Sequence, residues 1–270
     1  MPQSDVYGVT TAAIELGMAL FTLVEPHAGH EVAYNRWYEG DHFYAGCQIG
    51  PFNLAGNRYV ATRDLKALRY PDPSPIVPDR DTGSYVALYW VLAGHTEEWN
   101  RWAVAQVNAL HAAGRMFTDR DHIHTLLYDF DFAVARDSSV VRPYQALDHP
   151  YAGVVAVVGD GREPGGRARL DAALRDSLLP ELLTGSPVAQ VLQFTPHPLR
   201  SDAPGDVVRV AAPADRFLQL WFCERDPREC WDEVFAGLGA RLDAAQVDVA
   251  WVSPFIPTVW GTDTYTDQLH

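Results

Sequence analysis

The residue types best suited to chemistry gather in the stretch Gly17–Pro51. Asn35, Tyr38 and His42 follow one another there at spacings of three and four residues. On an α-helix, with about 100° per residue, these side chains share one face, and Trp37 lies nearly opposite to them. An imidazole titrates close to neutral pH, so His42 can both accept and return a proton. The spacing therefore predicts a helix whose polar face carries a general acid–base group.

Asn35 and Tyr38 are the predicted catalytic partners of His42. Their amide and phenol can donate hydrogen bonds to a carbonyl or enolate oxygen, and developing negative charge needs fixed donors in a dry site. Simpler interpretations stay open. His42 could stabilise the C-terminal end of a helix dipole, and Asn35 and Tyr38 could satisfy buried backbone groups. Trp37 could belong to the core, and the whole polar face could be exposed to water.

A wider set of aromatic and imidazole side chains is predicted to bind the substrate. Its members are His27, His30, Tyr34, Trp37, Tyr89, His124 and Trp260. His122 and His124 alternate on a predicted strand, so we expect them to face the same side. The H-x-x-H spacing of His27 and His30 is weaker evidence for a metal than two ligands one helical turn apart, so no metal is predicted. A haem with His27, His30 or His42 as axial ligand stays an alternative.

The elements that must position these residues occur in the same order twice. The first half reads as strand, helix, strand, strand, helix, strand, over residues 18–24, 32–43, 58–62, 85–93, 95–116 and 122–134. The second half repeats this order over residues 153–158, 167–183, 189–195, 217–223, 227–242 and 247–252. Apolar runs and alternation mark the strands, and helical spacing marks the helices. We expect an N-terminal repeat (1–135) with the active site, a linker (136–151) and a C-terminal repeat (152–270) whose tail wraps back.

This order of elements predicts the fold. A β-α-β-β-α-β unit forms one antiparallel sheet with both helices on one face, and the bare face must be covered. Two such units in one chain can cover each other. The predicted fold class is therefore α+β, with two ferredoxin-like βαββαβ repeats packed sheet to sheet in a single chain.

Composition excludes several classes of function. The formal net charge is -14 and no cluster of Lys and Arg stands out, so neither a nucleic acid nor a membrane is an expected partner. Three cysteines without a C-x-x-C motif argue against a disulfide framework. No apolar run approaches the roughly 20 residues of a membrane span, and no signal peptide is evident. We therefore expect a cytoplasmic monomer or homodimer. Phosphate-loop, dinucleotide-loop and G-x-S-x-G motifs are absent from the sequence, and no cofactor is predicted.

The pattern N-x-W-Y-x-x-x-H, carried by Asn35, Trp37, Tyr38 and His42 on the first predicted helix, resembles the dimeric α/β-barrel superfamily, and its EthD-like branch in particular. The resemblance implies a single-chain, pseudo-dimeric α/β barrel with a pocket between a sheet and its helices. It also implies chemistry of the cofactor-free oxidation, cyclisation, decarboxylation, dehydration or isomerisation type, with haem binding in distant branches. The pattern is absent from residues 167–183, so a second pocket would have lost its chemistry.

Together these features predict a cofactor-independent enzyme for an apolar cyclic or aromatic carbonyl compound, polyketide-like or steroid-like. His42 would move a proton α to the carbonyl or at a leaving hydroxyl, while Tyr38 and Asn35 hold the oxygen. That chemistry covers lyases, dehydratases, isomerases and cyclases. A cofactor-free monooxygenase, a non-catalytic binding barrel and a haem protein remain alternatives.

Overall fold

A computed structural model describes residues 13–138, 141–198, 200–202, 205, 207 and 212–270. The strands are β1 (Leu16–Pro26), β2 (Asn53–Val60), β3 (Tyr85–Leu92), β4 (Arg120–Ala135), β5 (Gly153–Gly161), β6 (Val188–His197), β7 (Arg216–Cys223) and β8 (Val247–Pro257). The helices are α1 (Glu31–Trp37), η2 (Tyr38–Gln48), α2 (Arg63–Lys66), α3 (Thr96–Ala112), η3 (Pro143–Gln145), α4 (Arg167–Ala173), η4 (Leu174–Leu178), α5 (Leu179–Leu183), α6 (Pro227–Cys230), η5 (Trp231–Phe235) and α7 (Leu238–Ala244). None of the helices in these described ranges combines the length and the apolar composition that crossing a membrane requires.

All these strands pair antiparallel and close into one barrel, in the order β1-β3-β2-β8-β5-β7-β6-β4. The first half contributes β2-β3-β1-β4 and the second half β6-β7-β5-β8, so each half is one ferredoxin-like sheet. The pairs β2–β8 and β4–β6 join the two sheets at both edges: β4 and β6 pair along most of β6, whereas β2 and β8 pair only where Tyr59 and Val60 meet Pro257 and Ile256. The predicted fold, two βαββαβ repeats facing each other in one chain, is confirmed.

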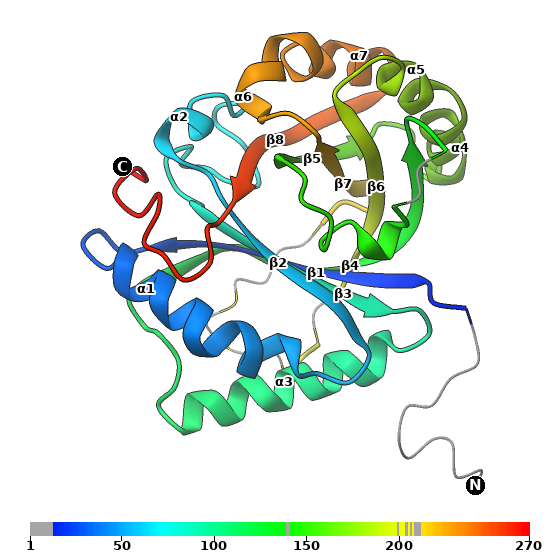
Figure 1. The fold of residues 1–270 in the computed structure, drawn as a ribbon. Helices are drawn as coiled ribbons and strands as arrows, with labels where there is room; N and C mark the ends of the chain where they lie inside the picture. Colours follow the sequence, from blue (N-terminus) through cyan, green and yellow to red (C-terminus); the bar gives the residue numbers. More distant parts are fainter. Residues whose placement is uncertain (1–12, 139–140, 199, 203–204, 206, 208–211) are drawn as a thin grey trace, which may run out of the picture.

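The helices form two separate layers outside the barrel. Figure 1 shows α1 and α3 of the first repeat on one side and α4 to α7 of the second repeat on the opposite side. Inside the barrel, the ring of Phe21 lies 6.0 Å from His124, 6.3 Å from Tyr128 and 6.5 Å from Trp251, measured between centroids. One apolar cluster joins both repeats through this interior, and a second lies beneath the helices of the second repeat. The barrel interior is therefore packed core.

The helix after β1 is not regular. The predicted helix over residues 32–43 begins as α1 and continues as the π-helix η2, at whose end the backbone N–H of Ile49 donates to the carbonyl oxygen of Tyr44 at 3.1 Å. In a π-helix, groups five residues apart come into line. Trp37 accordingly stacks on His42, with ring centroids 4.5 Å apart and 17° between the ring planes. The expectation that Trp37 lies opposite His42 is wrong, because it assumed the 3.6-residue turn.

The strand β4 is also irregular near its start. Its pairing with β1 shifts by one residue between His122 and His124, which is a β-bulge that turns these two side chains to opposite faces. His122 Nδ1 lies 2.8 Å from the hydroxyl of Thr125 on the helix-covered face, and His124 Nε2 lies 2.7 Å from the hydroxyl of Tyr128 inside the barrel. The expectation that both histidines face the same side is wrong, because it assumed unbroken alternation.

The C-terminal segment folds back over the first repeat, as Figure 1 shows. β8 runs further than the predicted strand, and the tail beyond it bonds to α1 and η2. Asn35 Nδ2 donates to the carbonyl oxygen of Thr262 at 2.9 Å, and the backbone N–H of Gly261 donates to the carboxylate of Glu39 at 2.8 Å. The tail therefore holds the helix that follows β1 in place.

Candidate functional site

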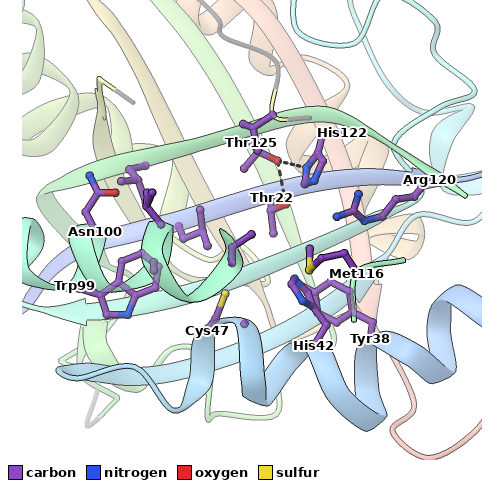
Figure 2. Close-up of a pocket in the computed structure, with 17 residues that line it drawn as sticks. Thr22, Tyr38, His42, Cys47, Trp99, Asn100, Met116, Arg120, His122 and Thr125 are labelled. Atoms are coloured by element: carbon purple, nitrogen blue, oxygen red, sulfur yellow. Dashed lines mark hydrogen bonds between the residues drawn. The ribbon is translucent and has the colours of Figure 1, made fainter. Parts of the chain in front are cut away.

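A cavity of about 110 Å³ lies between the sheet and the helices of the first repeat. Figure 2 shows its walls, which come mainly from η2, α3, β1 and β4. The lining residues are Leu20, Thr22, Tyr38, His42, Gly46, Cys47, Trp99, Asn100, Ala103, Val104, Val107, Met116, Arg120, His122, Thr125, Leu127 and Val207. Apolar walls with a few convergent polar groups are typical of a small-molecule site.

His42 stands at one end of this cavity with its ring held from two sides. One face stacks on Trp37, whose indole N–H donates to the carbonyl oxygen of Arg115 at 2.9 Å. The other constraint is Gly46, where an added Cβ would lie 2.6 Å from the imidazole Cε1, so only glycine leaves room for the ring. The Nδ1 atom of His42 is buried and has no hydrogen-bond partner among the described residues.

The surroundings of His42 keep its imidazole neutral. Removal from water lowers the pKa of His42 to about 3, and the nearby positive charge of Arg120 adds to this effect. The imidazole is therefore neutral across the physiological pH range, but it is a weak base in the free protein because its pKa lies far below that range. A negative charge that develops on a ligand beside it would stabilise the protonated form, because opposite charges attract strongly in a dry cavity.

Other polar groups extend the His42 end of the cavity along β1 and β4. The hydroxyl of Thr125 lies 2.8 Å from His122 Nδ1 and 2.9 Å from the hydroxyl of Thr22. Arg120 lies at the start of β4, with its guanidinium 5.6 Å from the ring centre of Trp37. Figure 2 shows these side chains from the strands opposite His42, across the cavity from η2. A ligand oxygen here would meet a cation and several possible hydrogen-bond donors.

Tyr38 contributes its ring rather than its hydroxyl. The ring lines the cavity beside His42, but the hydroxyl lies 3.1 Å from the hydroxyl of Tyr89, which is itself fully buried. Burial raises the pKa of both phenols well above the ordinary value of a tyrosine. Tyr89 does not belong to the cavity lining. The two hydroxyls satisfy each other inside the helix–sheet core.

Asn35 lies away from the cavity, in a buried polar network. Its side-chain oxygen accepts a hydrogen bond of 2.8 Å from Arg58, a guanidinium that is 1% exposed and that also bonds to Glu39 at 3.1 Å. Its amide nitrogen bonds to the tail at Thr262. The arrangement gives Asn35 a role in fixing α1 and the tail to the sheet. The ring of Tyr34 lies in the same region, with its centroid 5.9 Å from the guanidinium carbon.

The remaining predicted substrate-binding residues also lie outside the cavity lining. His27 and His30, in the loop before α1, approach Asp121 at 3.2 Å and Asp119 at 3.6 Å. His124 lies inside the barrel. Trp37 stacks on His42, and the ring of Tyr34 packs against the ring of Trp37. Trp260 in the tail packs edge-on against Phe43, with ring centroids 4.7 Å apart.

Several lining residues were not predicted from the sequence. They are Thr22, Trp99, Asn100, Arg120, His122 and Thr125. The only signal for them was the polar run Arg120–Thr125 at the start of an otherwise apolar strand, together with Asn100 on the apolar side of a helix. Recognising either signal required knowledge of which face of each element is covered.

The residues present do not fit a haem or a metal. A cavity of about 150 Å³ holds a single benzene ring, and the present cavity of about 110 Å³ has no space for the four pyrrole rings of a porphyrin. Of the three candidate axial ligands, His27 and His30 lie outside the cavity and His42 lines it. No group of three or more His, Cys, Asp or Glu side chains in the described part of the chain is arranged to hold a metal ion.

Comparison with known proteins identifies the fold. A solved structure described as an anthrone oxidase-like protein aligns with a TM-score of 0.51 at 9% identity, covering 92% of this chain and 95% of the other. A protein assigned as a chlorite dismutase aligns with a TM-score of 0.52 at 12% identity, covering 95% and 100%. No family model matches the sequence, and no curated protein is significantly similar to it. The chain has the dimeric α+β-barrel fold, with both repeats in one polypeptide.

Proposed function

We propose that the protein is a cofactor-independent acid–base enzyme that acts on a small carbonyl compound bound in the cavity of the first repeat. One observation carries the proposal: a neutral imidazole with a buried, unpartnered ring nitrogen lines an apolar cavity and faces Arg120 and His122 on the opposite wall. Buried polar atoms are hydrogen-bonded in the great majority of cases, so a buried ring nitrogen without a partner, on a residue that lines a cavity, supports a ligand or a water as its partner.

The proposed reaction is proton transfer next to a carbonyl group. The C–H bond α to the carbonyl breaks, its electron pair moves into an enolate, and the proton goes to the imidazole of His42. The enolate oxygen lies toward Arg120 and His122, where a positive charge and donor groups would stabilise it. Returning the proton to the same or a different atom gives exchange or isomerisation, and loss of a leaving group gives a lyase. Asn35 and Tyr38, expected to hold the oxygen, are replaced in this role by side chains of β4.

The size of the cavity sets the size of the proposed substrate. The sequence predicted an apolar cyclic or aromatic carbonyl compound, polyketide-like or steroid-like. About 110 Å³ is somewhat less than the roughly 150 Å³ that holds one benzene ring, so it limits the ligand to a single ring at most. Met116, which is flexible and lines the cavity, can adjust to a substituent on that ring. We therefore propose a one-ring ketone or a molecule of similar size as substrate.

The experiment follows α-proton exchange in D₂O by NMR, with acetophenone, 4-hydroxyacetophenone and 4-methylacetophenone as probes. We expect the protein to accelerate deuterium uptake at the acetyl methyl group, which is α to the carbonyl. His42→Gln should reduce this rate by roughly 10²–10⁴-fold. The control is His149→Gln, the same change at an exposed position on the linker. Oxygen consumption in the same incubations tests the monooxygenase alternative. Binding of the probes without any exchange above buffer would leave a binding protein and contradict the proposed reaction.

A further inference from the structure

We propose that Asn100 binds a second polar group of the substrate, at the end of the cavity remote from His42. This inference rests on the proposed function and names the substrate class more closely. The substrate would be a one-ring carbonyl compound with a hydroxyl or similar uncharged polar substituent across the ring. His42 would meet the reacting end and Asn100 the other end.

The first observation is the state of the Asn100 amide. The residue is 4% exposed, it lines the cavity, and its Nδ2 atom is buried without a hydrogen-bond partner among the described residues. A buried amide nitrogen without a partner costs about 1–3 kcal/mol. Asparagine also lowers the stability of a helix interior relative to leucine or alanine. Two unfavourable features at one position are explained if a ligand supplies the missing partner.

The second observation is the place of Asn100 in the cavity. Figure 2 shows Asn100 and Trp99 at one end, with His42, Tyr38 and Arg120 at the other. Between the two ends the lining is apolar, with Leu20, Ala103, Val104 and Leu127 among its residues. The indole N–H of Trp99 faces Gly50 instead, since an added Cβ there would lie 2.9 Å from it. Asn100 is therefore the polar group that this end presents to a ligand.

The chemistry of an amide decides what it would bind. An asparagine side chain offers two N–H donors and one carbonyl acceptor, so a hydroxyl can both accept from it and donate to it. A charged substituent is disfavoured, because the surrounding walls are apolar and burial of an unpaired charge is costly. A methyl group of similar size would leave the amide without a partner. The site is thus expected to distinguish hydroxyl from methyl at the far end of the ring.

The test compares two probes of similar size, 4-hydroxyacetophenone and 4-methylacetophenone, by isothermal titration calorimetry. We expect the wild-type protein to bind the hydroxyl probe about tenfold more tightly, the effect of one net hydrogen bond. Asn100→Leu, which keeps the branched shape in a larger side chain and removes the amide, should abolish or reverse this preference. The matched control is Asn108→Leu, the same change at an exposed position of the same helix α3, and it should keep the preference.

Equal affinities of the wild-type protein for both probes, no binding of either probe, or a preference that survives Asn100→Leu would each overturn the inference. The binding measurement does not depend on proton transfer, so His42→Gln should keep the preference for the hydroxyl probe. If that preference depends on Asn100 but no α-proton exchange is found, the binding subsite stands and the proposed reaction fails. If exchange depends on His42 but the preference does not depend on Asn100, only the inference fails.

Discussion

The two repeats share one strand order but differ in how completely their buried polar groups are satisfied. Beneath the helices of the second repeat, Trp221 donates to Gln219, Gln219 to Gln193, and Gln193 to Asp171, over distances of 2.6–3.0 Å. In the first repeat, atoms of His42 and other buried side chains have no partner. All the buried side-chain atoms without a partner in the described part of the chain belong to residues 42–100.

The difference indicates which repeat is built to bind a ligand. A polar network that satisfies all its members stabilises and specifies a core. The second repeat has such a network together with a dense apolar cluster that includes Leu174, Leu179 and Phe235. The first repeat has the apolar cavity that His42 lines together with buried groups that have no partner. This is expected where binding or catalysis requires groups that are left unsatisfied in the free protein. The comparison can be tested by equivalent changes in both repeats.

The largest effect is expected from a cavity made in the second repeat. Leu179 is fully buried in its apolar cluster, and Leu179→Ala should lower the free energy of unfolding by about 2–5 kcal/mol. Leu20→Ala in the first repeat should cost less, because Leu20 is partly exposed and already lines a cavity. Denaturant unfolding of both variants measures the two values. Equal losses of unfolding free energy in the two variants would show that the helix–sheet interfaces of the two repeats are packed alike.

A glycine-to-alanine change should lower the rate of α-proton exchange when it is made at Gly46 in the first repeat, but not at Gly237 in the second repeat. Gly46→Ala would place a Cβ 2.6 Å from the ring of His42 and displace the imidazole, so we expect a fall in α-proton exchange of roughly 10²-fold. Gly237→Ala, at the start of α7 in the second repeat, meets open space and should leave the exchange rate unchanged. A normal rate in Gly46→Ala would mean that the position of His42 does not matter.

The same amide-to-leucine change should have opposite effects in the two repeats. Gln193→Leu leaves the buried groups of Gln219 and Asp171 without a partner and should lower the free energy of unfolding by about 1–3 kcal/mol or more. Asn100→Leu removes an amide that has no partner and should raise the free energy of unfolding by about 1 kcal/mol. Thermal unfolding without ligand checks both signs. A loss of stability in Asn100→Leu would indicate a partner within the protein.

The smallest effect concerns pH. The pKa of His42 is about 3 in the folded protein against about 6.5 in an unfolded chain. The unfolded chain therefore binds more protons between these values, and stability is lost as the pH falls below about 6.5. Between pH 7 and pH 5, His42→Gln should lose up to about 2 kcal/mol less stability than the wild type. An identical acid dependence of both proteins would show that His42 is readily protonated in the fold.

Local patterns predicted the general positions of the main elements but not their irregular turns. The apolar runs of the strands and the spacing of the helices are local signals, and they gave the two βαββαβ units. The change from α1 to the π-helix η2 and the bulge in β4 each depend on a single residue of offset. Such offsets leave no clear mark in the sequence, yet they decide that Trp37 meets His42 and that His122 faces the cavity.

The candidate site was predictable only where the residue type was distinctive. His42 and Tyr38 line the cavity, and the helical spacing had singled them out. Asn35 was chosen for the same spacing but is held by Arg58 and the tail, a contact between segments far apart in the chain. Asn100 could not be chosen, because an asparagine on a helix is ordinary until its burial is known.

The order and apolar character of the strands by themselves determined that the chain forms two sheets that close on each other. Each sheet has an apolar face without helices, and exposure of that face to water is unfavourable. Tertiary structure decided that the apolar cavity lined by His42 lies beneath the helices of the first repeat. The reason is physical: whether a polar side chain is satisfied, exposed or left without a partner depends on atoms that other segments bring to it. His42 and Gln193 are both polar residues within predicted elements, and only packing left a ring nitrogen of His42 without a partner while it placed Gln193 in a closed network.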